Sequence, residues 1–332
     1  MKSIVNISVL LFSIVIFSCG NGSKNGESEK GDTLSLVHEK VTLADPFIML
    51  YHNTYYAYGT NSDEGIEVYT SNDLREWKLK GLALNKKDVW GERWFWAPEV
   101  YEINGVFYMY YSANEHICVA TSDSPLGPFT QKIRKPMIEN EKCIDNSLFI
   151  DEDGTPYLFF DRFNDGNDET PLLPFDLNIW VAELEKDYMT IKENTMHPCI
   201  HVSQKWEEVW PRVNEGSFVV KHEDLYYMTY SANSYESQFY GIGCATATDI
   251  MGEWKKYDTN PLLQKPEGLV GVGHSAMFVD KEGSLRIVYH AHKDMQHIHP
   301  RAMYIGKVDF VDENGIAIMK ISQDYIVPHL VK

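Results

Sequence analysis

The sequence predicts an all-β protein folded as a five-bladed β-propeller, and three observations support this fold. One hairpin pattern recurs five times, and its copies begin near residues 46, 98, 146, 216 and 275. The spacing of about fifty residues or more accommodates one blade of several strands. Helical periodicity is nearly absent, whereas aromatic residues, which favour strands, make up 13% of the 332 residues. A β-sandwich with similar hairpins is the alternative, but sandwiches do not usually repeat one unit five times.

The N-terminal segment has the features of an export signal. Lys2 provides a basic start, and residues 4–17 form an apolar segment that is too short for a convincing membrane span. Ser18 and Cys19 follow directly and resemble a bacterial lipobox. We therefore expect residues 1–18 to be a lipoprotein signal peptide and Cys19 to be lipidated, so that the protein is exported and lipid-anchored to the bacterial outer membrane, at its periplasmic face or at the cell surface. An ordinary signal peptide with a chance Cys is the alternative.

The rest of the chain divides into a short tether and one domain. Residues 19–38 are polar, rich in glycine and free of apolar periodicity, which predicts a flexible lipid-attached tether. From residue 39 to residue 332 the pattern is uniform, which predicts a single propeller domain. With Cys19 lipidated, four cysteines remain without CxxC spacing, so that disulfides and free thiols stay equally open.

Each repeat begins with an apolar strand, continues through a turn that carries Asn, Asp or Gly, and ends in a strand rich in aromatic residues. This is the pattern of a β-hairpin. The predicted hairpins span residues 46–58, 98–110, 147–160, 217–230 and 276–290. Three of them are followed by a further strand and by a segment that ends in Trp or Pro-Phe, at residues 72–77, 123–129 and 249–254. We expect these segments to close their blades.

The net charge of −18 excludes nucleic acid as a partner, because a polyanion binder needs clustered Lys and Arg and the chain has no basic run. A neutral carbohydrate makes no such demand. Beyond the N-terminal anchor, no segment is long and apolar enough to span a membrane. The oligomeric state does not follow from the sequence.

Acidic residues stand just before the first strand of several repeats. The innermost strands of a propeller converge on one axis, so residues at their starts face one another across one end of the channel. The residues at these starts are Asp45, the stretch 97–99, Asp145, Glu215 and His274. In an inverting glycosidase one carboxylate deprotonates a water molecule and one protonated carboxyl gives its proton to the glycosidic oxygen. A third carboxylate nearby raises the pKa of the acid, because like charges repel, and so keeps the acid protonated. A single Asp here would only cap a turn, but three matched carboxylates favour catalysis.

The same motifs resemble glycoside hydrolase family 43, which includes bacterial α-L-arabinofuranosidases, β-xylosidases and arabinanases. The matching motifs are Ala44-Asp45-Pro46, Trp96-Ala97-Pro98-Glu99, Ile144-Asp145-Asn146, Asn214-Glu215-Gly216 and Gly273-His274-Ser275, and the resemblance covers nearly all of residues 40–310. It implies that Asp45 is the general base, that Asp145 tunes and orients the acid, and that Glu215 is the general acid. Asn146 and Ser217 stand where the family often has Pro, which weakens any assignment to one sugar.

The resemblance also implies substrate contacts from Trp96, His274 and Arg301. His274 resembles an axial residue that faces calcium or water in some members, and this resemblance implies a possible structural Ca²⁺ near His274. A histidine in the channel that only makes hydrogen bonds is the favoured interpretation. We expect that the reaction requires no cofactor. The histidines at positions 290, 292, 297 and 299 lack an established ligand spacing, and we expect no metal there. Further aromatics could form stacking platforms or pack in loops, namely Trp90, Trp94, Phe95, Trp206 and Trp210.

The sequence therefore predicts an inverting glycoside hydrolase that releases arabinofuranosyl or xylosyl units from plant polysaccharides or oligosaccharides. Hydrolysis of another furanoside, such as a β-galactofuranoside, is one alternative. The other is a non-catalytic glycan-binding propeller of a surface uptake system, which the intact carboxylate trio disfavours. Neither the exact sugar and linkage nor exo against endo action follows from the sequence.

Overall fold

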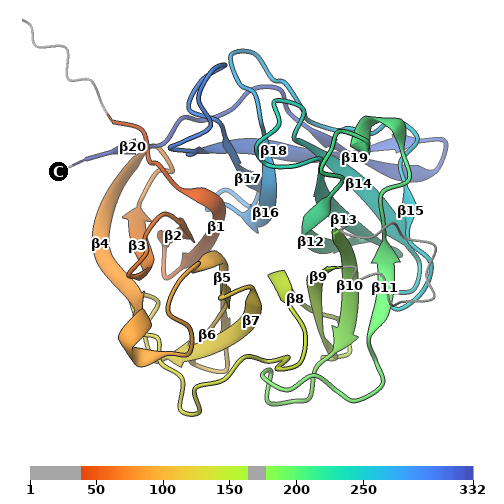
Figure 1. Cartoon of the computed structure of the whole chain (residues 1–332). Helices are drawn as coiled ribbons and strands as arrows, with labels where there is room; N and C mark the ends of the chain where they lie inside the picture. Colours follow the sequence, from red (N-terminus) through yellow and green to blue (C-terminus); the bar gives the residue numbers. More distant parts are fainter. Residues whose placement is uncertain (1–38, 164–176, 332) are drawn as a thin grey trace, which may run out of the picture. The chain divides into compact units, whose positions relative to one another are not determined.

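A computed structural model describes residues 39–163 and 177–331, and the predicted signal peptide, tether and lipidated Cys19 lie outside these residues. The described residues form five sheets, which Figure 1 shows arranged as blades around a common centre. The predicted all-β, five-bladed propeller is thereby confirmed. Helical structure in this part is limited to the short 3-10 turns η1 (Lys86–Asp88) and η2 (Lys205–Glu207). None of the described helices could cross a membrane.

The strands follow the chain blade by blade. Blade 1 contains β1 (Ala44–Tyr51), β2 (Thr54–Thr60), β3 (Gly65–Ser71), β4 (Glu76–Asn85) and the C-terminal β20 (His329–Leu330). Blade 2 contains β5 (Trp96–Ile103), β6 (Val106–Ala113) and β7 (His116–Ser122). Blade 3 contains β8 (Cys143–Ile150), β9 (Pro156–Phe163), β10 (Leu177–Glu183) and β11 (His197–Ile200).

The last two blades continue this order. Blade 4 contains β12 (Asn214–His222), β13 (Leu225–Ala232), β14 (Gly241–Ala247) and β15 (Lys255–Lys256). Blade 5 contains β16 (Gly273–Val279), β17 (Leu285–Ala291), β18 (Ala302–Glu313) and β19 (Ile316–Ile321). In every blade the two strands of the predicted hairpin pair antiparallel. The first strands β1, β5, β8, β12 and β16 contact one another in cyclic order, which makes them the innermost strands.

Blade 1 joins the two ends of the described chain. The short strand β20 pairs in parallel with β4, placing Leu330 beside Trp77. The Leu330 N–H donates to the Glu39 carbonyl (2.7 Å), and the Val41 N–H donates to the Pro328 carbonyl (3.0 Å). Because residues from both ends complete one sheet, opening the ring would break these hydrogen bonds.

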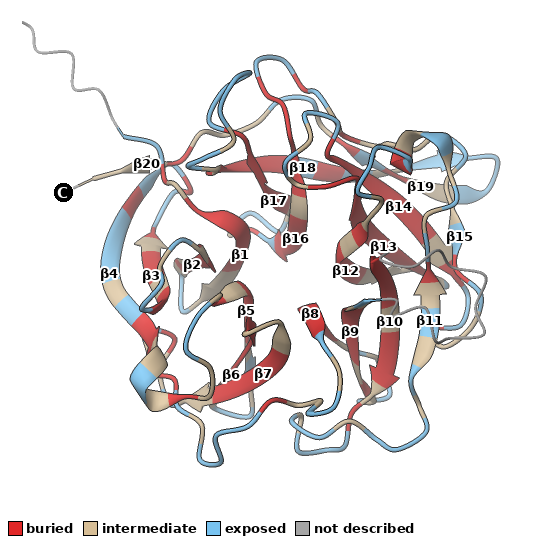
Figure 2. Cartoon of the chain, viewed as in Figure 1, coloured by how far each residue is buried: buried red, intermediate tan, exposed pale blue. Residues whose placement is uncertain are grey.

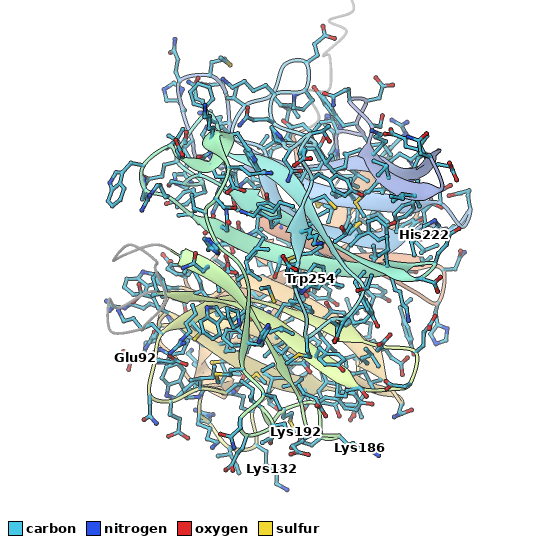
Figure 3. All side chains as sticks on the ribbon, turned by 90° about the vertical axis from the view of Figure 1, so that its right-hand side faces the viewer. Glu92, Lys132, Lys186, Lys192, His222 and Trp254 are labelled. Carbon is cyan, nitrogen blue, oxygen red and sulfur yellow. The ribbon has the colours of Figure 1, made fainter. Side chains whose placement is uncertain are left out.

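The apolar cores lie between neighbouring blades, and Figure 2 shows buried residues along the strands and exposed residues mainly in the loops. The predicted closing segments deliver Trp77 and Phe129, which are fully buried, and Trp254, which is nearly so. Trp254, which is labelled in Figure 3, belongs to an apolar cluster shared by blades 3 and 4. Its ring meets Phe159 edge-on at 5.9 Å. Aromatic rings of this size supply much of the apolar area that holds the blades together.

The cysteines of the described region are free thiols. Cys118, Cys143 and Cys244 are buried in the blades, and Cys199 is half-buried. Of the two alternatives left open by the sequence, the structure therefore has free thiols and not disulfides in these residues.

Candidate active site

Every innermost strand is irregular close to its start, and this irregularity creates the site. In each blade two residues of the inner strand oppose one residue of its partner, which is a β-bulge. One bulged residue in each blade has a positive φ, and these residues are Asp45, Ala97, Asp145, Gly216 and His274. The bulges turn their side chains out of the normal alternation of the strand, at the same place in all five blades.

This register refines the expected set of matched residues. Glu215 does not occupy the bulge position of blade 4, because Gly216 does and Glu215 precedes it. A Cβ atom on Gly216 would make a tight contact of 3.0 Å with Nδ1 of His274, and the carboxyl of this blade comes from the preceding residue. In blade 2 the matched residue is Ala97, whereas Glu99 is buried further along the strand and accepts a hydrogen bond from the Tyr101 hydroxyl.

A cavity of about 310 Å³ lies where these strands begin. Its lining residues are Asp45, Thr60, Trp96, Ile144, Asp145, Glu215, Tyr235, His274, His299 and Arg301. All six residues predicted to be catalytic or substrate-binding are therefore brought together around one hollow. Thr60, Ile144, Tyr235 and His299 were not predicted from the sequence.

Asp45 is held as a carboxylate by its neighbours. Nη1 of Arg301 donates to Oδ1 of Asp45 (2.9 Å), and Nδ1 of His274 lies 3.6 Å from the same oxygen. Burial alone would raise the pKa of Asp45, but the charges of Arg301 and His274 outweigh it and hold the pKa well below its usual range. An ionised Asp45 can act as a general base.

Glu215 has the opposite electrostatic setting. Burial and the charge of Asp145 raise its pKa to about 8, against the opposing effects of His274 and of the Tyr240 hydroxyl, which donates to Oε1 (2.8 Å). Burial and the charge of Asp45 also raise the pKa of Asp145, to about 7. At neutral pH Glu215 is therefore mostly protonated and can act as a general acid. Two carboxyl groups whose environments push their pKa values apart are the pattern expected of an acid–base pair.

His290 and Tyr240 form a layer behind the carboxyls that the sequence reasoning missed as functional residues. The two rings stack at 5.6 Å, and the fully buried His290 accepts the Asp45 N–H at Nδ1 (3.1 Å). Burial and the charge of Arg301 lower the pKa of His290 to about 3, so it is neutral. The sequence signal that could have identified His290 is its position at the end of the predicted hairpin 276–290, whose strands pair His290 with Gly273, next to the matched His274.

The remaining histidines of the fifth blade have separate environments. His292 Nε2 bonds to the Tyr235 carbonyl (2.7 Å), and the exposed His297 pairs with Asp294 (2.9 Å). His299 lines the cavity, where its ring lies 6.1 Å from that of Tyr235.

Of the aromatics near the mouth, Trp94 has the clearest relation to the cavity. It stacks on Trp96 with ring centroids 5.5 Å apart and planes inclined by 20°, and the Arg93 guanidinium covers it at 3.9 Å. Phe95 is buried against Tyr111, and Trp206 donates to Gln204, so these two pack in the fold. Trp210 is 68% exposed.

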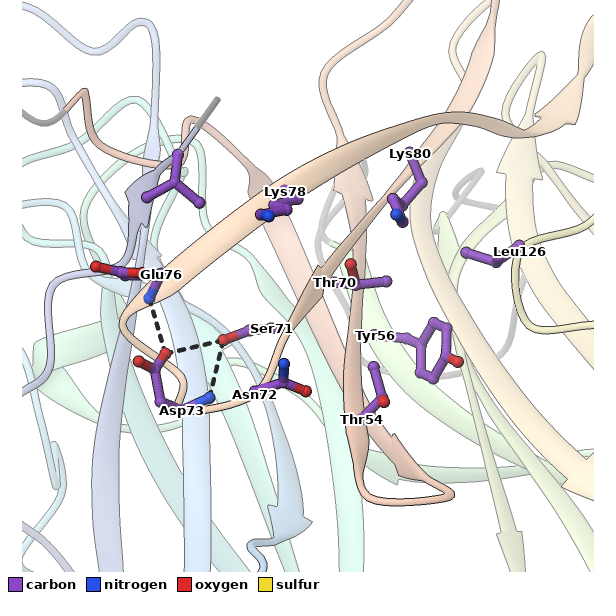
Figure 4. A pocket seen from close by; sticks show the side chains of 11 residues that line it. Thr54, Tyr56, Thr70, Ser71, Asn72, Asp73, Glu76, Lys78, Lys80 and Leu126 are labelled. Carbon is purple, nitrogen blue, oxygen red and sulfur yellow. Dashed lines mark hydrogen bonds between the residues drawn. The ribbon is translucent and has the colours of Figure 1, made fainter.

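A second hollow, of about 450 Å³, lies on blade 1 and is drawn in Figure 4. Its acidic residues Asp73 and Glu76 belong to one turn, in which Asp73 accepts the Glu76 N–H (2.9 Å) and the Ser71 hydroxyl (3.2 Å). Those hydrogen bonds fix the turn that leads into β4. The central cavity, by contrast, collects carboxyls from three blades, and we therefore identify it as the candidate active site.

Comparison with known proteins gives a consistent result. Residues 39–315 match the family model described as "Glycosyl hydrolases family 43". A crystal structure of an endo-1,4-β-xylanase from Bacteroides thetaiotaomicron is 44% identical and superimposes with a TM-score of 0.83, covering 90% of this chain and 100% of that one. A thermostable family-43 glycoside hydrolase is 36% identical with a TM-score of 0.77, covering 87% of this chain and 95% of that one.

Among curated relatives, a β-D-galactofuranosidase of Aspergillus niger is 23% identical over 272 residues, which cover 74% of this chain and 73% of the relative. An extracellular exo-α-(1→5)-L-arabinofuranosidase of Streptomyces avermitilis is 25% identical over 272 residues, which cover 74% of this chain and 54% of the relative. The chain thus spans about half the length of the Streptomyces relative.

Proposed function

Because this chain belongs to glycosyl hydrolase family 43, we propose that its central cavity hydrolyses a glycosidic bond with inversion at the anomeric carbon. The observation that supports this most strongly is that one cavity holds two carboxyls in opposite settings, Asp45 against the Arg301 cation and Glu215 bonded to the Tyr240 hydroxyl. The pKa of Asp45 is held well below its usual range, and that of Glu215 is raised to about 8.

The mechanism follows from these protonation states. The Asp45 carboxylate deprotonates a water molecule, which attacks the anomeric carbon from one face of the sugar. Glu215 gives its proton to the departing oxygen, so the leaving group departs as an alcohol. Asp145 keeps the proton on Glu215 until it is needed, because a nearby negative charge disfavours ionisation. An inverting enzyme leaves room for the water by holding its two carboxyl groups about 6.5–9.5 Å apart.

We propose a terminal arabinofuranosyl or xylosyl unit of a plant polysaccharide or oligosaccharide as the substrate. The cavity of about 310 Å³ is at the small end of the range of about 300–1,000 Å³ for ligand sites, which favours one sugar unit over a stretch of chain. Trp96 offers an apolar face for the ring, and Arg301 offers hydrogen-bond donors for hydroxyls. The arabinofuranosidase name of the Streptomyces relative agrees with a pentose.

A β-galactofuranoside is the second candidate, because the Aspergillus relative carries that activity in its name. Aryl α-L-arabinofuranoside, β-D-xyloside and β-D-galactofuranoside, assayed side by side at equal concentration, separate these specificities. If none of them is hydrolysed, and arabino- and xylo-oligosaccharides also remain intact, the chain is a glycan-binding propeller and not an enzyme.

The roles of the two carboxyls are tested by changing the leaving group. Glu215→Gln removes the acid and should lower the rate about 10²–10⁴-fold on an oligosaccharide, whose leaving group needs a proton. The same variant should lose far less on a 2,4-dinitrophenyl glycoside, whose leaving group departs as an anion. Asp45→Asn should lose equally on both substrates, because the attacking water still needs its base. An equal loss by Glu215→Gln on both substrates would remove Glu215 from the role of acid.

We further propose that the reaction needs no cofactor, since the side chains supply both acid and base. The structural calcium expected near His274 does not fit the groups present there. Nδ1 of His274 faces Asp45 and Asp145, at 3.6 and 3.8 Å. Asp45 is already paired with the Arg301 cation, which would repel Ca²⁺, and calcium prefers six to eight oxygen ligands.

We also propose that the chain is an exported lipoprotein, anchored through Cys19 to the bacterial outer membrane. The apolar segment 4–17 and the Ser18-Cys19 pair support this. Mass spectrometry of the N-terminal peptide of the mature protein tests the proposal. A diacylglyceryl group on Cys19 is expected, and an unmodified N-terminus at another residue would contradict it.

A further inference from the structure

A hydrogen bond between adjacent blades is repeated five times around the channel. At each bulge the positive-φ residue has an N–H that donates to a side chain on the second strand of the preceding blade. The five bonds run from Asp45 to His290 (3.1 Å), from Ala97 to Thr60 (3.0 Å), from Asp145 to Ser112 (3.1 Å), from Gly216 to Asp161 (3.0 Å) and from His274 to Ser231 (2.7 Å). The acceptor residue pairs in its own blade with the residue just before that blade's bulge.

Asp161 is chemically out of place in this series. Three of the five acceptors are hydroxyls, from Thr60, Ser112 and Ser231, so a hydroxyl is sufficient to bind the freed N–H. Asp161 is 0% exposed, and burying a carboxyl group costs considerably more than burying a hydroxyl. A second task, beyond joining blade 3 to blade 4, would explain the carboxyl.

The surroundings of Asp161 indicate that task. One oxygen each from Asp145, Asp161 and Glu215 lies within 4.8 Å of the others. Oδ2 of Asp161 accepts the Gly216 N–H, whereas Oδ1 is buried and has no hydrogen-bond acceptor or donor assigned among the described residues. Three titratable groups interact electrostatically with Asp161, namely Asp145 and Cys143 on β8 and Glu215 on β12. On β10 the residue opposite Asp161 is the apolar Ile179. Asp145 and Asp161 share a side-chain hydrogen bond, which two carboxyls can form only if one of them carries a proton.

We propose that Asp161 is a permanently protonated positioning residue, whose O–H donates to Asp145 and keeps Asp145 ionised beside the acid Glu215. This inference rests on the acid role proposed for Glu215. The proton chain has three members: a neutral Asp161, an anionic Asp145 and a neutral Glu215. Asp161 does not touch the substrate, since it is fully buried and does not line the cavity.

The electrostatics agree with this geometry. Burial and the charges of Asp145 and Glu215 raise the pKa of Asp161 well above its usual range. Burial raises the pKa of Asp145 to about 7, and the hydrogen bond with Asp161 opposes that rise. Without this bond Asp145 would compete with Glu215 for the proton, and fewer molecules would hold it on the catalytic acid.

Two substitutions separate the structural task from the proposed one. Asp161→Ser reproduces the hydroxyl of blades 2 and 4, so it can still accept the Gly216 N–H. Its hydroxyl lies one bond closer to the backbone and takes the place of Oδ2, so that no O–H is left in the place of Oδ1 beside Asp145. Asp161→Asn offers a carbonyl oxygen for the Gly216 N–H and an amide N–H for Asp145. It therefore imitates a carboxyl that never ionises.

The measurement is the pH profile of kcat/KM on an oligosaccharide or on an aryl glycoside with a poor leaving group, whose cleavage needs the acid, with thermal unfolding of each variant recorded in parallel. The Ser variant should shift the alkaline limb by about one pH unit to lower pH, which corresponds to about a ten-fold loss on that limb. The Asn variant should restore the limb toward the wild-type position. A wild-type limb in the Ser variant would overturn the proposal. If the Ser variant unfolds below the assay temperature, the Asn variant alone tests the proposal. Asn is always neutral, so it should leave the alkaline limb in place if Asp161 is protonated in the wild type. A shifted limb in the Asn variant would show that Asp161 is ionised.

Wild-type turnover and loss of turnover in Glu215→Ala, measured in the same assay, keep the two proposals apart. If the wild type is active, Glu215→Ala is inactive and the Asn variant shifts the alkaline limb as far as the Ser variant does, only the role of Asp161 is wrong. If Glu215→Ala keeps full activity, the proposed acid is wrong.

Discussion

Removing the hydroxyl of Tyr240 should make Glu215, the proposed acid, weaker. That hydroxyl donates to Oε1 of Glu215 at 2.8 Å and lowers the pKa of Glu215, against the larger effect of burial. Tyr240→Phe deletes this bond with little change in packing. The ring still stacks on His290 and still fills the space beside Gly273, where a Cβ atom would lie 2.1 Å from it.

The magnitude follows from the strength of the lost bond. A hydrogen bond to a charged group contributes about 1.5–3 kcal/mol. The neutral carboxyl of Glu215 also accepts this bond, but is stabilised by it less than the carboxylate is. A net difference of about 1.4 kcal/mol corresponds to one pKa unit, so the pKa of Glu215 should rise from about 8 to about 9. The sign is fixed, because the anionic form loses more than the neutral form. The alkaline limb of kcat/KM should therefore move up by about one pH unit, while the plateau falls a few-fold because a weaker acid transfers its proton less readily.

The assay is the pH profile of kcat/KM on an oligosaccharide or on an aryl glycoside with a poor leaving group. Tyr226→Phe is a matched control, because it also removes a tyrosine hydroxyl bonded to a carboxylate (Asp151, 2.6 Å), but in a residue that does not line the cavity. An alkaline limb that stays in place or moves to lower pH in Tyr240→Phe would refute the assignment of Glu215 as the group titrating there.

Three further predictions concern the base, the cofactor and the fold. Arg301→Met should move the acid limb of kcat/KM up by about one pH unit or more, because Asp45 must be ionised and loses its main cationic partner; a limb that does not move would contradict the role of Asp45. Overnight dialysis against EDTA should leave the rate unchanged, and recovery on adding Ca²⁺ after a loss would reverse the proposal that no cofactor is needed. Lys256→Met should lower the free energy of unfolding by about 3–5 kcal/mol in denaturant titrations, because Glu207 is fully buried and both its oxygens accept from Lys256 at 2.7 Å; a loss below about 1 kcal/mol would show that the pair contributes little.

The blades could be predicted from the sequence because their signals are local. Alternating apolar residues, a turn with Asn, Asp or Gly and an aromatic second strand fit within about fifteen residues, and repetition of that unit implies a ring. The family resemblance depended on short motifs at the same places, such as Ile144-Asp145-Asn146, and the family match over residues 39–315 confirms it.

The parts that were missed depend on contacts between distant segments. The two-residue strand β20 has no pattern of its own, and only its pairing with β4 defines it. Tyr240 and His290 come from blades 4 and 5 and meet only in the folded ring. Asp161 directly follows the predicted hairpin 147–160, and its contact with Gly216 exists only when blade 3 packs against blade 4.

The position of Glu215 shows where repeat arithmetic fails. Counting from strand to strand suggested that it matches Asp45 and Asp145, but the bulge of blade 4 places Gly216 there. Glycine suits this position, because its φ is positive (59°) and a Cβ atom would lie 3.0 Å from the His274 ring. The sequence repeat therefore identified a carboxyl that lines the cavity, but it placed that carboxyl one residue away from the bulge position.

The configuration of the first sugar released tests the central claim most directly. Proton NMR of the reaction, recorded before the product mutarotates, distinguishes the two anomers as they form. An acid and a base acting on opposite faces of one sugar ring require a product whose anomeric configuration is opposite to that of the substrate. Accumulation of the inverted anomer is the predicted result, and initial release of the retained anomer would contradict the account.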